Sequence, residues 1–247
     1  MPIDIDLRRV EELGLNSSAP PGQLLYDGWL LRLWPGQAKR ARSVNAVYPS
    51  TRALKDKLAY CEQLYRSHQL PLIFRITPFS EPAALDVELE ARGFPKFDLT
   101  AVETAPIKAP TPSTGPAEPL DLPAWVDAIG ELRQASPAHR TRHLQRLQSS
   151  PLDYRALAIH QGGRVVATGL TIVEDGWAGL FDIATDAPLR RRGHGRQIVQ
   201  ALLKQAWLLG ARQAYLQVSA DNTAARTLYA PFGFRQQYQY WYRGQAD

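Results

Sequence analysis

The segment Asp186–Arg196 has residues suited to binding phosphate groups. It reads D-A-P-L-R-R-R-G-H-G-R, and an amphipathic run that begins at Gln197 follows it without a break. Glycines allow backbone amides to converge on one point, and a helix N-terminus behind them favours a bound anion. The helix dipole contributes only about 0.3–1 kcal/mol, whereas each hydrogen bond to a charged oxygen contributes about 1.5–3 kcal/mol. We therefore expect backbone amides to provide most of the binding; the alternative is a solvent-exposed basic loop without a ligand.

The residues that follow predict the elements that position this loop. A helix is expected over 194–209, with Gly210 as its C-cap. A short buried strand over Gln213–Ser219, a capped helix over 221–229 and a final strand over 236–242 come next. The apolar side of the first helix is formed by Ile198, Val199, Leu202, Leu203, Ala206 and Leu209.

The order of these motifs resembles the GNAT superfamily of N-acetyltransferases. The run R-R-R-G-H-G lies between a strand and a helix, and N-x-x-A-x-x-L-Y-x-x-x-G-F follows over 222–234. The resemblance covers about 154–243 and implies a mixed, mostly antiparallel sheet flanked by helices. It also implies that acetyl-CoA is the co-substrate.

The resemblance assigns residues to the site for acetyl-CoA. The pyrophosphate is expected on the amides of the arginine and glycine loop, and the pantetheine arm beside a strand edge like an additional strand. Asn222 is implied to lie near the pantetheine arm and Tyr229 near the sulfur. The residues expected at the cofactor site are Ile183, Ala184, Thr185, Arg190, Arg191, Arg192, Gly193, His194, Gly195, Arg196, Asn222 and Ala225.

Acetyl transfer to an amine requires proton transfers at neutral pH. A lysine-like amine with a pKa near 10.4 is neutral in only about one molecule in 2,500 at pH 7, a cost of roughly 4.6 kcal/mol. Tyr229 has an ordinary pKa near 10, so it stays protonated and is the expected general acid for the leaving thiolate. Asp182 interrupts an apolar strand, and we expect it to be the base, acting through water. The alternatives are a packed aromatic side chain for Tyr229 and a structural carboxylate for Asp182.

Neither a metal nor a cysteine is expected in the reaction. His139 and His143 share a helix face, but they stand among arginines with no neighbouring carboxylate or cysteine. The single cysteine, Cys61, can form no internal disulfide, which is typical of a reducing compartment. No base accompanies Cys61 in the sequence, so we expect a buried thiol rather than a nucleophile.

Composition narrows the class of protein further. The chain has 247 residues, 45% of them apolar, and a net charge of +5. No apolar run is long enough to cross a membrane, and the first residues lack the pattern of a secretion signal. We therefore expect a cytoplasmic protein with no membrane partner. No nucleic-acid-binding motif is present, so no nucleic acid is expected as a partner.

A proline-rich connector predicts two domains. The segment Pro106–Pro119 has the composition of an extended linker, and the chain before it repeats the later motifs more faintly. In the N-terminal copy, Tyr48–Arg52 replaces the glycine loop and Leu89 stands at the position of Tyr229. We expect a degenerate GNAT-like domain over 1–107, a linker over 108–120 and a catalytic domain over 121–247. The first domain is expected to form part of the wall of the acceptor site.

These features together predict an α/β enzyme of two tandem GNAT-like domains. We expect an N-acetyltransferase that moves an acetyl group directly from acetyl-CoA to a primary amine in a ternary complex. The expected partner is a small-molecule amine, and the expected assembly is a monomer or a homodimer. The alternatives are a CoA-binding regulatory module without turnover and an acetyltransferase for a macromolecular amine. The acceptor is not identified, because the motifs concern only the cofactor.

Overall fold

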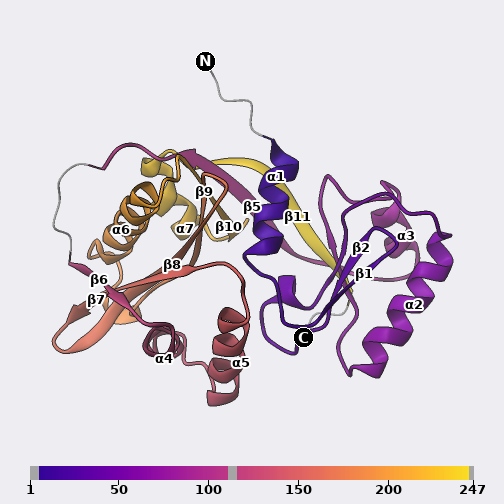
Figure 1. The fold of residues 1–247 in the computed structure, drawn as a ribbon, viewed down its shortest axis with the longest axis horizontal. Helices are drawn as coiled ribbons and strands as arrows, with labels where there is room; N and C mark the ends of the chain where they lie inside the picture. The colour runs from indigo at the N-terminus through magenta and orange to yellow at the C-terminus, as the bar shows by residue number, and fades with distance from the viewer. Residues whose placement is uncertain (1–5, 111–115, 245–247) are drawn as a thin grey trace. The chain divides into compact units, whose positions relative to one another are not determined.

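The computed structural model describes residues 6–110 and 116–244, which form two compact units (Figure 1). Of the described residues, unit 1 comprises 6–101, 219–221 and 238–244, and unit 2 comprises 102–110, 116–218 and 222–237. The chain therefore passes between the units several times.

Unit 1 contains strands that form a mixed sheet. Strands run in the order β1-β2-β3-β4-β11; β3 and β4 are parallel, and the other pairs with assigned register are antiparallel. Helix α2 connects the two parallel strands and packs its buried Leu58, Cys61 and Tyr65 on one face. The elements are α1 (Leu7–Asn16), β1 (Gln23–Tyr26), β2 (Trp29–Arg32), β3 (Val44–Ala46), α2 (Leu54–Ser67), β4 (Ile73–Ile76), α3 (Leu85–Ala91) and β5 (Lys96–Pro106).

Unit 2 repeats this arrangement on a larger scale. Its strands run in the order β10-β9-β8-β7-β6, and β9 and β10 form the parallel pair. Helix α6 makes the connection between them, as α2 does in unit 1. The elements are β6 (Ala117–Leu120), α4 (Leu122–Leu132), α5 (Pro137–Gln148), β7 (Tyr154–Gln161), β8 (Arg164–Glu174), β9 (Trp177–Thr185), α6 (His194–Leu208), β10 (Gln213–Ser219), α7 (Thr223–Tyr229) and β11 (Arg235–Gly244).

Helices cover both faces of the sheet in unit 2 because side chains alternate along β8. Leu170 and Ile172 pack against α4, whereas a Cβ at Gly169 would lie 2.8 Å from Leu202 of α6. Figure 1 shows α4 and α6 on the two sides of this sheet. The mixed, mostly antiparallel sheet flanked by helices was predicted from the sequence, and it is confirmed.

The apolar face of α6 agrees with the sequence pattern in its central turns. Ile198, Val199, Leu202 and Ala206 are buried. Leu209 was expected on the same face, but it is the C-cap residue and is 41% exposed. The helix ends there because Gly210 takes a φ of +93°, which stops the helical repeat.

The compact units differ from the expected domains, because β11 and β5 each contribute residues to both units. Residues Trp241–Gly244 of β11 pair with Ile73–Ile76 of β4, so the last strand of the chain completes unit 1. Residues 102–106 of β5 belong to unit 2. The last part of the expected linker, Ala117–Leu120, forms β6 and pairs with β7. The boundaries at 107 and 121 therefore remain a sequence-based division that the compact units do not follow.

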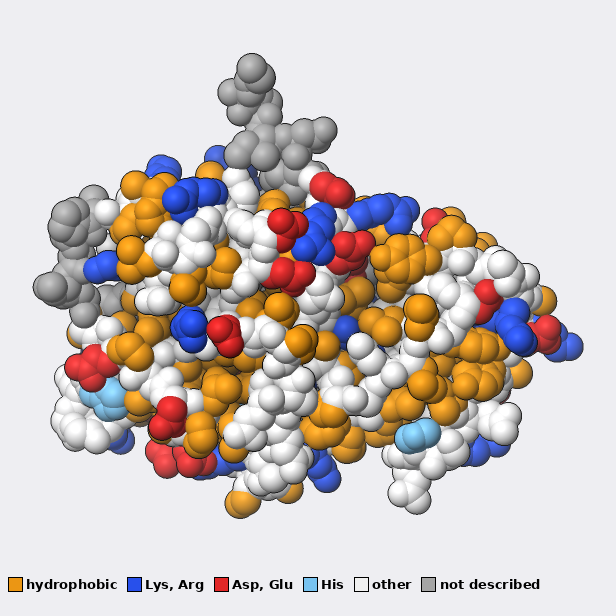
Figure 2. All heavy atoms as spheres, in the orientation of Figure 1, with side chains coloured by type: hydrophobic (Ala, Val, Ile, Leu, Met, Phe, Trp, Pro, Cys, Tyr) orange, Lys and Arg blue, Asp and Glu red, His pale blue; other side chains and the backbone are white. Residues whose placement is uncertain are grey.

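The surface carries charges of both signs. On the face drawn in Figure 2, Lys and Arg side chains are interspersed with Asp and Glu side chains. Among residues 6–110 and 116–244, no helix has the length and hydropathy needed to cross a bilayer.

Candidate active site

The two parallel strands of unit 2 separate at their carboxyl ends. The ladder between β9 and β10 runs from Gln213 paired with Trp177 to Leu216 paired with Leu180, and no further pair follows. Residues 181–185 of β9 therefore present one backbone edge that β10 does not cover, while Ala184 and Thr185 pair with β8 on the other edge. The expected cofactor residues Ile183, Ala184 and Thr185 all lie in this stretch.

A β-bulge sharpens the separation. The register with β8 passes from Leu170 opposite Phe181 to Thr168 opposite Ala184, so Asp182 and Ile183 together oppose Gly169. Asp182 takes a φ of +51°, which an aspartate tolerates better than most residues. A Cβ at position 169 would lie 3.1 Å from Ile183 and 3.0 Å from Ile198. Glycine thus lets the bulge and α6 approach each other.

The loop before α6 presents a set of backbone donors. Arg191 has a φ of +65°, and Gly193, the N-cap of α6, has a φ of +89° and no side-chain cap. The first backbone bond of the helix runs from the Gln197 N–H to the Gly193 carbonyl. In the described part of the chain, the amides of residues 191–196 have no acceptor. Such a set of unpaired amides at a helix N-terminus is suited to an anion.

Glycine is favoured at the two positions of the loop for different structural reasons. A Cβ at Gly193 would meet nothing within 4 Å, so the positive φ is the reason for glycine there. A Cβ at Gly195 would lie 3.3 Å from Leu228 and 3.5 Å from Thr185 Oγ1. Gly195 therefore lets the start of α6 lie close to α7 and to the end of β9. The loop, the separated strand edge and α7 meet at this point.

The remaining loop residues are on the surface. The side chains of Arg190, Arg191, Arg192 and Arg196 are exposed. His194 is half-buried, and its Nδ1 lies 3.3 Å from Gln197 Oε1. The prediction for this loop concerns its backbone amides. Among the described residues, the amides at 191–196 have no acceptor.

Two of the expected site residues, Asn222 and Tyr229, lie at the two ends of α7. The Asn222 side chain accepts a hydrogen bond from the Ala225 amide at 3.0 Å and thereby caps the helix. At the other end, Tyr229 is buried and its ring packs edge-on against Phe234 at 5.9 Å. Within the described residues, the Tyr229 hydroxyl has no hydrogen-bond partner.

The surroundings of Tyr229 favour its protonated form. Burial, reinforced by the charge of Glu103 and opposed by Arg133, raises the pKa of Tyr229 to about 12. Glu103 is buried and pairs with Arg226 at 2.9 Å. Neither Glu103 nor Arg133 was identified from the sequence, because each is far from Tyr229 along the chain.

Asp182 has two side-chain partners. Arg133 Nη1 donates to Asp182 Oδ1 at 2.7 Å, and His143 Nε2 lies 3.3 Å from Oδ2. Burial alone would raise the pKa of Asp182, but the His143 hydrogen bond and the Arg133 charge outweigh it and hold the pKa well below its usual range. A carboxylate held in this way is a weak proton acceptor. The surroundings therefore argue against the expected role of Asp182 as the base.

His143 was set aside with His139 as a spacing that could suggest a metal. The described residues contain no group of three or more His, Cys, Asp or Glu side chains suited to a metal ion. His143 instead packs edge-on against Trp125 and faces Asp182. No pattern near His143 or Asp182 indicated this pair, because α5 and β9 are far apart in the chain and meet only in the fold.

Comparison with known proteins agrees with this geometry. The family model for the acetyltransferase (GNAT) family matches residues 124–234, which include the bulge, the loop and Tyr229. The chain contains a GNAT acetyltransferase domain. The resemblance stated from the sequence is thereby confirmed, and the protein is classed as an acyltransferase.

Relatives extend the similarity beyond this domain. The chain is 29% identical to the uncharacterized N-acetyltransferase YobR of Bacillus subtilis, over 96% of this chain and 98% of that protein. It is 34% identical over 83 residues to the [ribosomal protein bS18]-alanine N-acetyltransferase of Escherichia coli, covering 34% of this chain and 56% of the relative. A GCN5-related N-acetyltransferase from Kribbella flavida has the same fold, with a TM-score of 0.69 and 17% identity over 100% of this chain and 97% of that one.

Proposed function

We propose that the acetyltransferase domain transfers an acetyl group from acetyl-CoA to a primary amine by direct attack in a ternary complex. The observation that carries the proposal is the set of amides at 191–196 without acceptors, placed beside the separated end of β9. The proposal includes a cytoplasmic location and a small-molecule amine as the acceptor.

The loop fits the diphosphate of acetyl-CoA. Its amides at 191–196 lie at the N-terminus of α6 without acceptors among the described residues, and each hydrogen bond to a charged oxygen is worth about 1.5–3 kcal/mol. The exposed side chains of Arg190, Arg191, Arg192 and Arg196 add positive charge around the same point. When bound, acetyl-CoA supplies the activated acetyl group. Residues 183–185 would hold the pantetheine arm along their uncovered backbone edge, and Asn222 and Ala225 would border it at the start of α7.

Tyr229 is the proposed general acid. Its pKa is raised to about 12, so the hydroxyl stays protonated at neutral pH. A hydroxyl without an internal partner can donate to a leaving thiolate at no cost in existing hydrogen bonds. The Tyr229 oxygen would thus deliver a proton to the sulfur as the thioester bond breaks.

His143 replaces Asp182 as our proposed base. Asp182 is an ionised acceptor beside His143 Nε2, so a neutral imidazole carries its proton on Nε2. That tautomer leaves the Nδ1 lone pair available to accept a proton from the amine, directly or through water. Asp182 is then a positioning residue, which orients the ring and stabilises the charged imidazole that forms.

The decisive experiment measures binding and turnover in one preparation. Calorimetry with acetyl-CoA should give one site per chain, and a thiol-release assay over polyamines, amino acids and aminoglycosides should reveal an acceptor. Binding without thiol release on any amine would favour a CoA-binding regulatory module. Absence of acetyl-CoA binding to the folded protein would overturn the proposal.

A macromolecular acceptor is the second candidate, and one observation favours it. The Escherichia coli relative is named for an alanine of a ribosomal protein. Peptides with a free N-terminal alanine should therefore be assayed beside the small amines. Turnover confined to peptides would replace the small-molecule acceptor in our proposal and leave the reaction itself unchanged.

A further inference from the structure

Unit 1 contains a pocket where β3 and β4 separate. The parallel ladder has two rungs, Val44 with Phe74 and Asn45 with Arg75, and the pocket opens beyond the second rung. Helix α1 and the turn at 77–80 complete its walls, which border a space of about 410 Å³ that is partly open solvent. In the topology of unit 1, this is the position that the separation of β9 and β10 has in unit 2.

Two polar atoms on the last rung are buried without partners. Asn45 is 3% exposed, and its Nδ2 donates to the Ser43 carbonyl at 2.9 Å, which fixes the amide so that Oδ1 is left as the acceptor. Neither Asn45 Oδ1 nor Arg75 Nε has a partner among the described residues. Burying an unpaired polar atom is unfavourable. A ligand group that reaches Asn45 Oδ1 must be a donor, and one that reaches Arg75 Nε must be an acceptor.

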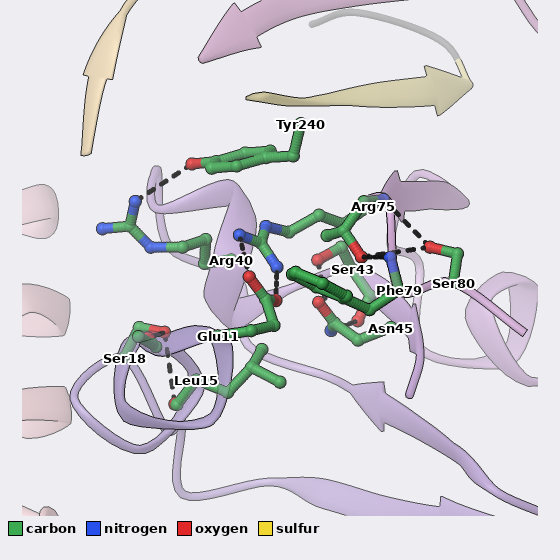
Figure 3. Close-up of polar contacts among 12 residues, drawn as sticks. Glu11, Leu15, Ser18, Arg40, Ser43, Asn45, Arg75, Phe79, Ser80 and Tyr240 are labelled. Carbon is green, nitrogen blue, oxygen red and sulfur yellow. Dashed lines mark hydrogen bonds and ion pairs between the residues drawn. The ribbon is translucent and has the colours of Figure 1, made fainter. Parts of the chain in front are cut away.

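The wall beside these atoms is already fixed. Glu11 and Arg75 form a buried ion pair, with Arg75 Nη2 at 3.1 Å from Glu11 Oε2, and Tyr238 donates to the same carboxylate at 2.7 Å. The Tyr240 ring lies 3.7 Å from the Arg75 guanidinium carbon (Figure 3). Because these contacts hold both charged groups in place, a ligand would lose little energy in ordering the wall.

Charges around the pocket balance. Glu11 and Glu12 are offset by Arg8 and Arg75, so the charged lining carries no net formal charge. Arg8 is 56% exposed and lies at the rim, with its guanidinium 5.5 Å from the Phe79 ring. A neutral molecule with separated positive and negative groups suits this lining better than a polyanion does.

We propose that this pocket binds a small zwitterion of the α-amino-acid class. The ammonium group donates to Asn45 Oδ1 and is attracted by Glu12. The carboxylate accepts from Arg75 Nε and faces Arg8. Phe79 contacts the apolar part of the ligand. The proposal is independent of the reaction proposed for unit 2.

Acetyl-CoA is not the proposed occupant, because the loop before α2, where its diphosphate would lie in unit 1, already binds an internal anion. Asp27 accepts hydrogen bonds from the amides of Thr51 and Arg52 at 3.0 and 2.9 Å. Lys57, which is buried, lies with its Nζ 3.4 Å from the same carboxylate. A diphosphate would have to displace this internal anion.

The test is calorimetry on the full chain without acetyl-CoA, using the proteinogenic α-amino acids one at a time. At least one should bind with one site per chain. Arg8→Gln, at an exposed position, should weaken that binding by roughly tenfold, which corresponds to about 1.4 kcal/mol. Arg66→Gln makes the same charge change on an exposed residue of α2 outside the pocket, and it should bind as the wild type does.

A second variant probes the buried acceptor. Asn45→Leu removes Oδ1 at similar volume and should abolish binding, with circular dichroism and thermal unfolding used to verify that the fold is kept. If Asn45→Leu does not fold, Arg8→Gln decides alone. The proposal is overturned if no amino acid binds, if binding is unchanged in every folded variant, or if the chain takes up a second equivalent of acetyl-CoA.

Discussion

Arg133 Nη1 donates to Asp182 Oδ1 at 2.7 Å, and this contact joins the end of α4 to the bulge of β9. The two residues are 49 positions apart in the sequence. Asp182 also faces His143 of α5, so one carboxylate connects both helices to the strand. The bulge is therefore held from the helical side, and its geometry depends on an ionised Asp182.

Asp182→Asn should destabilise the protein at neutral pH. Asparagine keeps the size of the side chain and tolerates the positive φ, but it removes the negative charge that pairs with Arg133 and faces His143. We expect the free energy of unfolding to fall by about 1.5–3 kcal/mol, the range for hydrogen bonds to charged groups. Urea unfolding at pH 7 measures the difference.

The pH dependence follows from the lowered pKa of Asp182. Because the folded pKa lies below the ordinary value of 3.8, the stabilisation is fully present above that value and is lost as the pH falls further. The difference in the free energy of unfolding between wild type and Asp182→Asn should therefore become smaller below about pH 4. Asp153→Asn is the control, since Asp153 is 88% exposed in its ion pair. An equal loss of stability in both variants would contradict this prediction.

Tyr229→Phe should lower kcat by about 10²- to 10⁴-fold, the usual contribution of a positioned acid or base. The KM for acetyl-CoA should stay the same, because the hydroxyl is proposed to act on the leaving sulfur only. Since the described structure gives the hydroxyl no partner, the free energy of unfolding should change by less than about 0.5 kcal/mol. Steady-state kinetics with the acceptor identified by thiol release checks the first point. An unchanged kcat would remove Tyr229 from the reaction.

Local features of the site were predictable from the sequence. Gly193 and Gly195 stand before an amphipathic run, and their conformational freedom and small size indicated a loop of converging amides. Asn222, followed three residues later by Ala225, indicated a helix cap. In each case the chemistry depends on residues that are neighbours in the chain, so spacing alone carries the signal.

Features that depend on distant pairing were not predictable. The partners of Asp182 come from α4 and α5, and no pattern near Asp182 indicates them. The last strand was expected to complete the C-terminal domain, but residues 241–244 pair with β4 in unit 1. Strand register and exchange depend on which edges meet in three dimensions, and the alternation of Tyr238, Tyr240 and Tyr242 is compatible with either unit.

Gly193→Ala should weaken acetyl-CoA binding through the backbone. A Cβ there meets no atom within 4 Å, but the φ of +89° costs a side chain about 1–2 kcal/mol. The loop would relax and its amides would diverge. Gly163→Ala is a matched control, because Gly163 has a φ of +78° and an equally open surrounding in a hairpin turn. Calorimetry should show weaker binding only for Gly193→Ala; equal affinities in both would contradict an amide cradle.

Cys61→Ala should leave kcat unchanged. Cys61 is fully buried in the core of unit 1, and burial raises the pKa of its thiol to about 12. The thiolate needed for an acyl-enzyme is therefore absent at neutral pH. Mass spectrometry after incubation with acetyl-CoA should find no acetyl group on Cys61. An acetylated Cys61 that passes its acetyl group to the amine would overturn direct transfer.

Asp27→Asn should lower the melting temperature at neutral pH, because the Asp27 carboxylate accepts hydrogen bonds from the Thr51 and Arg52 amides in the loop before α2. Those hydrogen bonds hold the pKa of Asp27 well below its ordinary value of 3.8. The stabilisation is therefore present above that value and is lost as the pH falls below it, so the two proteins should melt alike in strong acid. Asp56→Asn, an exposed change in the same helix, is the control. Once Asp27 is protonated, its charge no longer stabilises the fold. A difference in melting temperature that persisted unchanged at low pH would therefore mean that the asparagine destabilises the fold in another way.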